Sequence, residues 1–200
     1  SSIALALNIM ARDLDTGRSD RLKQYFALTR SEISQCLEIT DTLLRLGSPA
    51  SSRKQLIELA SSVTAVTRLL AYQADNLGIT VKVDIAPDLR VLIADSDLRM
   101  VVTNLLMNAF HAMPQGGRLT IRGARNDGSV ILTVADTGIG IAPEHLQDIF
   151  MPFWSRRADD PTGRGLGLAI TRTIADRAGA TISVESTLRQ GSCFPLSFPD

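Results

Sequence analysis

Three polar side chains recur along one apolar stretch of the sequence, in a pattern that suits metal and phosphate chemistry. Asn104, Asn108 and His111 are spaced at i, i+4 and i+7, so they fall on one face of a predicted helix. A neutral amide oxygen is a good hard ligand for Mg²⁺ when phosphate oxygens share the metal. The alternative is a pair of core asparagines with ordinary hydrogen-bond partners, and this motif alone does not exclude it.

A second group follows a predicted strand and combines one carboxylate with two glycines. Asp136, Gly138 and Gly140 form an Asp-Thr-Gly-Ile-Gly run. An ionised carboxylate only accepts hydrogen bonds, so it suits an exocyclic amine such as the N6 group of adenine. The glycines would let a flat ring approach the backbone closely. Taken singly, the run is also compatible with an ordinary turn.

Aromatic residues then precede a polar stretch that contains proline. Phe150, Phe153 and Trp154 lie just before Arg157 and the polar residues 158–162. Aromatic anchors beside such a loop predict a hinged lid. A plain loop with buried phenylalanines is the alternative.

The fourth group is a cluster of glycines that opens a predicted helix. Gly163, Gly165 and Gly167 alternate with Arg164 and Leu166. Glycines at a helix N-terminus leave backbone N–H groups free to bind phosphates. The spacing matches neither G-x-G-x-x-G nor G-x-x-x-x-G-K-[ST], which excludes a dinucleotide-binding fingerprint and a P-loop NTPase.

The elements that must position these groups follow from periodicity and turn residues. Helical spacing at 1–14 and 20–47, with a turn between, predicts an α-helical hairpin, and 47–51 is the best linker. A thin hairpin cannot bury its own apolar stripes, so we expect it to pair with another element or another copy. A capping-box pattern at Ser52 and Gln55 predicts the start of the next helix. The expected helices cover 52–76, 95–112, 143–149 and 166–178, and the expected strands cover 79–85, 91–93, 119–124, 130–135, 181–186 and 194–198. The pattern predicts an α+β fold, a two-layer α/β sandwich whose mixed sheet carries helices on one face.

Composition narrows the class of protein. Lys+Arg and Asp+Glu each number 21 among 200 residues, so the formal net charge is zero and nothing indicates a nucleic-acid partner. The apolar runs are too short to span a membrane, and no secretory signal is expected. Two cysteines and two histidines without metal-ligand spacing argue against zinc and against a disulfide scaffold. A reducing, cytoplasmic setting is the expectation.

Taken in order, the four groups between Asn104 and Leu168 resemble the N, G1, F and G2 boxes of the ATP-binding domain of sensor histidine kinases. That domain has the Bergerat-type fold shared with DNA gyrase and related ATPases. The resemblance covers roughly residues 52–199 and implies an ATP-binding catalytic domain at 52–200. It implies a partial dimerisation and phosphotransfer hairpin at 1–48. Cytoplasmic location is implied for this portion, with a membrane anchor in a full-length protein left open.

The resemblance also implies roles for individual residues toward ATP and Mg²⁺. Asn108 would bind Mg²⁺, and Asn104 would assist near the phosphates. Asp136 would accept from the adenine amine beside Gly138 and Gly140. Phe153 would anchor the lid. The implied catalytic residues are Asn104, His111 and Arg157, and the residues implied to surround the triphosphate are Gly163, Arg164, Gly165, Leu166 and Gly167. Arg164 stands where the family commonly has a small residue.

The sequence also lacks features of the family. The family's phosphoacceptor is a histidine near the start of the first hairpin helix, and residues 1–48 contain none. Either that residue precedes Ser1 or the protein lacks it; we expect neither His111 nor His145 to replace it. Hydrolysing relatives of the fold have a glutamate four residues before the Mg²⁺-binding asparagine, where this chain has Asn104, an amide that cannot act as a base.

The first hypothesis is therefore a histidine kinase of a two-component system. It would be a homodimer through the hairpin and would pass phosphate on to the receiver domain of a response regulator. The alternatives are a dimeric nucleotide-binding regulator without transfer activity and an ATPase of the same fold.

Overall fold

The structure, a computed structural model, describes Phe26, Thr29 and residues 53–154 and 165–199. The chain divides into two compact units, Ser1–Pro49 and Ala50–Asp200. The helices predicted at 1–14 and 20–47, and their hairpin, lie outside the described residues apart from Phe26 and Thr29. The side chain of Phe26 is exposed and that of Thr29 is buried. The second unit contains the four groups that the sequence singles out.

A mixed sheet forms one layer of the second unit. In the described part of the chain its order is β2-β4-β5-β8-β6, with β7 also paired to β8. The strands are β2 (Ile79–Ile85), β4 (Gly117–Asn126), β5 (Ser129–Asp136), β6 (Thr181–Ile182), β7 (Glu185–Thr187) and β8 (Gly191–Pro199). β2 runs parallel to β4, and the other pairs are antiparallel. The predicted mixed sheet is confirmed.

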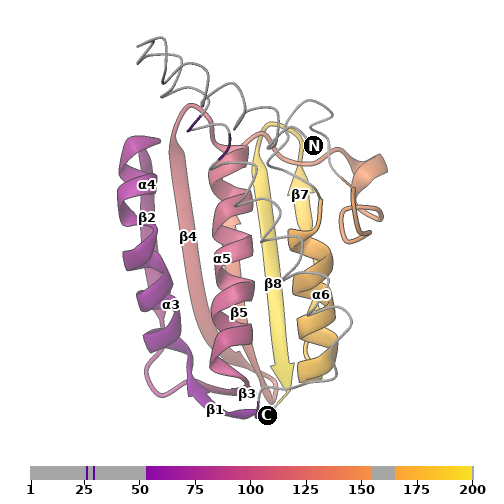
Figure 1. Cartoon of the computed structure of the whole chain (residues 1–200). Coiled ribbons are helices and arrows are strands. Elements are labelled where there is room, and N and C mark those ends of the chain that lie inside the picture. Colours follow the sequence, from indigo (N-terminus) through magenta and orange to yellow (C-terminus); the bar gives the residue numbers. More distant parts are fainter. Residues whose placement is uncertain (1–25, 27–28, 30–52, 155–164, 200) are drawn as a thin grey trace, which may run out of the picture. The chain divides into compact units, whose positions relative to one another are not determined.

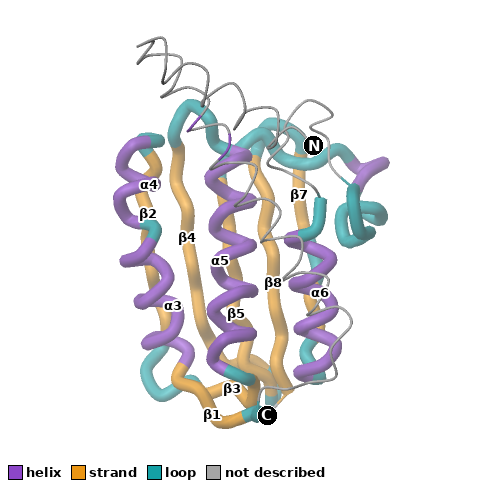
Figure 2. Tube along the Cα trace, in the orientation of Figure 1, coloured by secondary structure: helices purple, strands orange, loops and turns teal. Residues whose placement is uncertain are grey.

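Helices form the second layer. α3 (Leu59–Leu69), α5 (Asp95–Ala112) and α6 (Gly167–Ala178) lie side by side across one face of the sheet, with α4 (Ala71–Asn76) following α3 (Figures 1 and 2). The core lies between the layers, where fully buried side chains from helices and strands meet. Its members include Leu59, Leu105, Leu119, Leu132 and Leu196. The predicted two-layer α+β fold is confirmed.

The turn between β4 and β5 shows how local chemistry sets register. Asn126 pairs with Ser129, which leaves Asp127 and Gly128 as the loop. Both loop residues have positive φ, 45° and 75°, as a type I′ turn requires. The predicted hairpin is confirmed, and its register brings Asp136 opposite Leu119 on β4.

The helix predicted from 52 to 76 was wrong at its start. Residues Gln55–Glu58 form β1, which pairs antiparallel with β3 (Arg90–Ile93) in a separate two-stranded sheet. The side chain of Leu56 is exposed on this strand, whereas Ile57 packs against the core. Pairing with β3 satisfies this backbone, and such tertiary pairing overrides weak helix propensity. The helix begins at Leu59, and Leu70 interrupts it before α4.

Two other predicted elements differ in extent. The segment predicted as a short helix at 143–149 contains a 3₁₀ helix at Pro143–His145, followed by turns. The strand predicted at 181–186 is divided into β6 and β7, which pair with different parts of β8. The division places Ser186 opposite Ser192 near the end of the sheet where β5 finishes.

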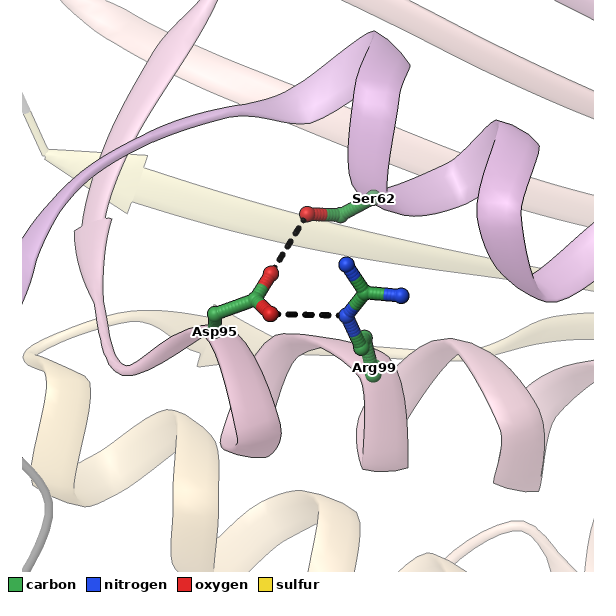
Figure 3. Close-up of polar contacts among 3 residues, drawn as sticks. All are labelled: Ser62, Asp95 and Arg99. Carbon is green, nitrogen blue, oxygen red and sulfur yellow. Dashed lines mark hydrogen bonds and ion pairs between the residues drawn. The ribbon is translucent and has the colours of Figure 1, made fainter.

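A polar cluster fastens α3 to the start of α5. The hydroxyl of Ser62 donates to Asp95 Oδ1 at 2.9 Å, and Arg99 Nε donates to Asp95 Oδ2 at 2.7 Å (Figure 3). The hydrogen bond from Arg99, with help from Ser62, lowers the pKa of Asp95 against the opposing effect of burial. Because α5 carries Asn104 and Asn108, this cluster helps to fix the helix that presents them.

None of the helices within 53–154 and 165–199 combines the length and apolarity needed to cross a membrane.

Candidate nucleotide site

Asp136 ends β5 and is held by backbone groups on two sides. It is only 8% exposed. Its Oδ1 accepts hydrogen bonds from the N–H of Gly138 at 2.8 Å and of Ser192 at 3.3 Å. Burial raises the pKa of Asp136, and these two hydrogen bonds act against that rise. No hydrogen bond from a described residue reaches Oδ2, so this oxygen remains able to accept from an external donor.

The two glycines after Asp136 are required because the loop packs tightly against its neighbours. A Cβ on Gly138 would lie 2.4 Å from the carbonyl oxygen of Ala112, and one on Gly140 would lie 2.1 Å from that of Thr187. Gly140 also has a φ of +65°. The loop is thus wedged between the end of α5 and the β7–β8 turn. This close approach of backbone to backbone explains both glycines, and the predicted approach of a flat ring to the same loop stays a prediction.

Two backbone hydrogen bonds of Ile139, one donated and one accepted, hold the same loop on both sides. Its N–H donates to the carbonyl of Ala112 at 2.9 Å, and its carbonyl accepts from the N–H of Arg189 at 2.7 Å. The side chain of Ile139 is exposed. The backbone beside Asp136 is therefore anchored to α5 and to the β7–β8 turn.

Asn104 joins the polar face of α5 to the glycines at the start of α6. Its Nδ2 donates to the carbonyl of Gly167 at 3.1 Å. Thr171, fully buried on α6, donates its hydroxyl to the same carbonyl at 2.9 Å. The structure thus brings the polar face of α5 and the glycine cluster together, and the side chain of Asn104 holds the glycine segment in position.

Asn108, one turn further along α5, has a buried amide nitrogen that finds no hydrogen-bond partner among the described residues. A buried polar group of this kind calls for an external partner. A half-turn of the carboxamide would present Oδ1 at the same position. His111 occupies the last turn of α5 and is half-buried.

The donor set fits a magnesium ion that is shared with phosphates. The described residues contain no group of three or more His, Cys, Asp or Glu side chains that could hold a metal. A protein-only metal cage is therefore absent from this part of the chain. One amide oxygen from Asn108, with phosphate oxygens and water, matches the way Mg²⁺ is bound beside nucleotides.

The segment predicted as a lid is described up to Trp154. Phe153 has a φ of 66°, and its ring is 69% exposed, so its anchor is the backbone rather than the ring. Its N–H donates to the carbonyl of Gly165 at 3.0 Å. A Cβ on Gly165 would lie 2.0 Å from the carbonyl oxygen of Trp154. This contact explains the second glycine of the cluster.

Other residues of the predicted site contribute differently or lie outside the described part. The side chain of Leu166 is buried in the core, so only its backbone could face a phosphate. Arg157, Gly163 and Arg164 lie outside the described residues. Their predicted roles therefore stay predictions.

Sequence reasoning missed the side chains and backbone groups that support Asp136 from β7 and β8. Ser192 supplies an N–H to the carboxylate, and Ser186 contacts Ser192. Thr171 beside Asn104 was also missed. The available signal was strand pairing, because a residue that ends one antiparallel strand lies opposite a residue that begins its neighbour.

Comparison with known proteins agrees with this geometry. Residues 93–200, more than half of the chain, match the family described as histidine kinase-, DNA gyrase B- and HSP90-like ATPases. Sensor histidine kinase ZraS of Salmonella typhi is 34% identical over 186 residues, which cover 92% of this chain and 38% of that relative. The chain thus spans about two fifths of the length of ZraS.

Solved structures give the same fold. The catalytic domain of histidine kinase ThkA is 26% identical with a TM-score of 0.66, covering 73% of this chain and 95% of that one. ThkA in complex with the response regulator protein TrrA (23% identity, TM-score 0.74, covering 98% and 58%) shares the fold. So does full-length ShkA in complex with AMPPNP (24% identity, TM-score 0.78, covering 90% and 39%). The chain belongs to the family of histidine kinase-, DNA gyrase B- and HSP90-like ATPases, and its second unit is an ATP-binding catalytic domain of the sensor histidine kinase type.

Proposed function

We propose that the chain binds Mg²⁺–ATP and transfers the γ-phosphate to a histidine that residues 1–48 do not supply. The observation that carries this is the buried Asp136 carboxylate, with Oδ1 fixed by two backbone N–H groups and Oδ2 left to accept from an adenine amine. Gly138 and Gly140 hold the backbone beside it in place. The residues of this site surround a nucleotide in the roles that the family resemblance implies.

In this proposal the phosphates lie between α5 and the start of α6. Asn108 supplies the protein ligand to Mg²⁺, and Asn104 keeps Gly167 in position through its hydrogen bond. The metal would neutralise phosphate charge when bound. His111, Arg157 and the cluster Gly163, Arg164, Gly165, Leu166 and Gly167 complete the phosphate side.

Transfer is favoured over hydrolysis by the chemistry of residue 104. A water nucleophile must lose a proton to a base, and the side chain of Asn104 is an amide whose nitrogen already donates to Gly167. An imidazole nucleophile needs no such base, because a neutral ring nitrogen attacks with its own lone pair. The alternatives, an ATPase and a regulator that binds nucleotide without transfer, remain as outcomes of the experiment.

We also expect specific partners and a specific location for the protein. ThkA is seen in complex with the response regulator TrrA, and a receiver domain of that kind is the expected acceptor of the phosphate here. We expect a homodimer through residues 1–48, where the exposed ring of Phe26 offers apolar surface to a second copy. We propose a cytoplasmic setting for this portion of the protein. No nucleic-acid partner is expected.

The experiment supplies the missing nucleophile. The chain is incubated with labelled ATP, Mg²⁺ and a separate helical hairpin that carries the phosphoacceptor histidine. An acid-labile, base-stable label on the hairpin supports the kinase. Steady ATP hydrolysis without a label favours the ATPase, and nucleotide binding with neither product favours the regulator. A hairpin with that histidine replaced by alanine is the control.

A further inference from the structure

Ser186 on β7 lies in one cross-strand row with the carboxylate of the candidate site. Asp136 pairs with Ser192 on β8, and Ser192 pairs with Ser186. Residues directly opposite each other on neighbouring strands point to the same face of a sheet. The three side chains therefore share the face that the helices cover.

The hydroxyl of Ser186 joins three segments of the chain. Its Oγ accepts from the N–H of Ile141 at 2.8 Å, donates to the carbonyl of Gly191 at 2.8 Å and lies 3.0 Å from Ser192 Oγ. Ile141 closes the loop that follows Asp136, and Gly191 begins β8. A Cβ on Gly191 would lie 2.0 Å from the carbonyl oxygen of Asp136, so these segments are in close contact.

The placement of the two hydroxyl hydrogens follows from these contacts. A carbonyl only accepts, so the single hydrogen of Ser186 goes to Gly191. The contact between Ser186 and Ser192 then requires the hydrogen of Ser192. If Ser186 instead donated to Ser192, the contact between Ser186 and the Gly191 carbonyl would have no proton. Ser186 thereby uses its one donor and both lone pairs.

The consequence lies at Ser192, which is buried beside Asp136. With its hydrogen directed to Ser186, the Ser192 hydroxyl has only lone pairs to offer to a ligand. The neighbouring carboxylate, which accepts from the Ser192 N–H, also only accepts. Two acceptors side by side match an amine and repel a carbonyl oxygen. Adenine carries an amine at position 6, where guanine carries a carbonyl.

We propose that Ser186 is a positioning residue that makes this site selective for adenine nucleotides over guanine nucleotides. The inference rests on the proposed function, because it concerns the same nucleotide site. Ser186 acts through Ser192, by directing its hydrogen, and through Ile141, by holding the loop beside the carboxylate. It need not touch the nucleotide.

The test compares three ligands across a small set of variants of the 200-residue chain. The ligands are a non-hydrolysable ATP analogue, the matching GTP analogue and inorganic tripolyphosphate, titrated with Mg²⁺ in a calorimeter. Ser186→Ala removes the hydroxyl, and Ser186→Thr retains it. Ser183→Ala is the matched control, since it makes the same change at an exposed position between β6 and β7.

Ser186→Ala should bind the ATP analogue about tenfold more weakly, because one hydrogen-bond network is lost. Its affinities for the GTP analogue and for tripolyphosphate should stay unchanged, so the preference for ATP over GTP should also fall about tenfold. Ser186→Thr and Ser183→Ala should behave like the wild type. If Ser186→Ala fails to fold, Ser186→Cys, a similar-sized but weaker hydrogen-bonding residue, carries the same expectation. Amide exchange at Ile141 should be faster in either variant.

Two results overturn the inference alone. One is that Ser186→Ala binds the ATP analogue as tightly as the wild type does and keeps the same preference for ATP over GTP. The other is an equal loss for all three ligands, which indicates a merely structural role. A wild-type chain that binds no nucleotide overturns the proposed function and this inference with it.

Discussion

The side-chain amide of Asn104 donates a hydrogen bond to the backbone carbonyl of Gly167, 63 residues further along the chain, at 3.1 Å. This bond connects the polar face of α5 with the first residue of α6, where the glycine segment becomes a helix. Thr171 donates to the same carbonyl from the next turn of α6. The amide side chain and the glycine segment are therefore parts of one site.

Replacing Thr171 should weaken nucleotide binding more than the same replacement at another threonine of α6. Thr171→Val removes the hydroxyl that helps to hold the Gly167 carbonyl, and we expect affinity for an ATP analogue to fall roughly threefold to tenfold. Thr173→Val is the matched control, because the Thr173 hydroxyl makes the same kind of bond, to Ala169 at 2.9 Å, away from Asn104. Calorimetry and denaturant unfolding of both variants provide the comparison. Equal affinities in the two variants would contradict the role of Gly167.

Asn108 should show opposite effects on stability and on binding. Its amide nitrogen is buried without a partner among the described residues, so Asn108→Leu should stabilise the nucleotide-free chain by about 1 kcal/mol. The same change should abolish the increase in nucleotide affinity that Mg²⁺ produces. Urea unfolding and titrations with Mg²⁺ or with a chelator measure the two effects. A less stable variant that keeps its Mg²⁺ dependence would show that the amide is a structural group.

Asp136 should give a stability contribution that falls as pH rises. Burial raises its pKa above the ordinary value of 3.8, so the folded chain holds this proton more tightly than the unfolded chain. The stabilising contribution of Asp136 is complete at pH values below its pKa in the unfolded chain. It is lost as pH rises through the higher pKa of the folded chain. Asp136→Asn keeps an acceptor for both backbone N–H groups and removes the titration.

The measurement is the difference in unfolding free energy between the wild type and Asp136→Asn, taken between about pH 4 and pH 8. The difference should shift in favour of the variant as pH increases. A difference independent of pH, or one that shifts toward the wild type, would show that burial does not govern this carboxylate.

The contribution of Asp95 to the stability of the fold should have the opposite pH dependence. Its pKa is lowered, chiefly by the hydrogen bond from Arg99, so its contribution is present above 3.8 and is lost as pH falls through the lower folded pKa. Ser62→Ala leaves a buried position without its hydrogen bond to Asp95 and should cost about 1 kcal/mol. Ser61→Ala, at an exposed neighbouring position, should cost much less. Equal urea midpoints for the two variants would argue against the tether between α3 and α5.

The sequence predicted the parts of the fold that local patterns specify. The span of α5, the β4–β5 hairpin and the mixed sheet follow from periodicity and from the turn at Asp127 and Gly128. β1 could not be found in this way, because Gln55–Glu58 becomes a strand only by pairing with β3, which lies more than thirty residues away in the chain. The exposed side chain of Leu56 has the same cause.

The residues of the candidate site also fall into those that the sequence predicted and those that depend on distant pairing. Asp136 and the asparagines of α5 were predicted because their residue types are unusual for their positions. Ser186 and Ser192 were missed because serine is common and their importance arises from cross-strand pairing. The structure adds a second reason for Gly138 and Gly140, since a neighbouring carbonyl lies in the space that a side chain at either position would need.

The most direct test of the nucleotide site is a calorimetric titration of the wild type and Asp136→Ala with a non-hydrolysable ATP analogue and Mg²⁺. Removing the carboxylate leaves the adenine amine without its acceptor, which should cost about 1–3 kcal/mol of binding free energy. Affinity for inorganic tripolyphosphate, which has no amine, should be the same in both proteins. We expect saturable binding by the wild type and much weaker binding by Asp136→Ala. Equal affinity of the two proteins for the ATP analogue would contradict it.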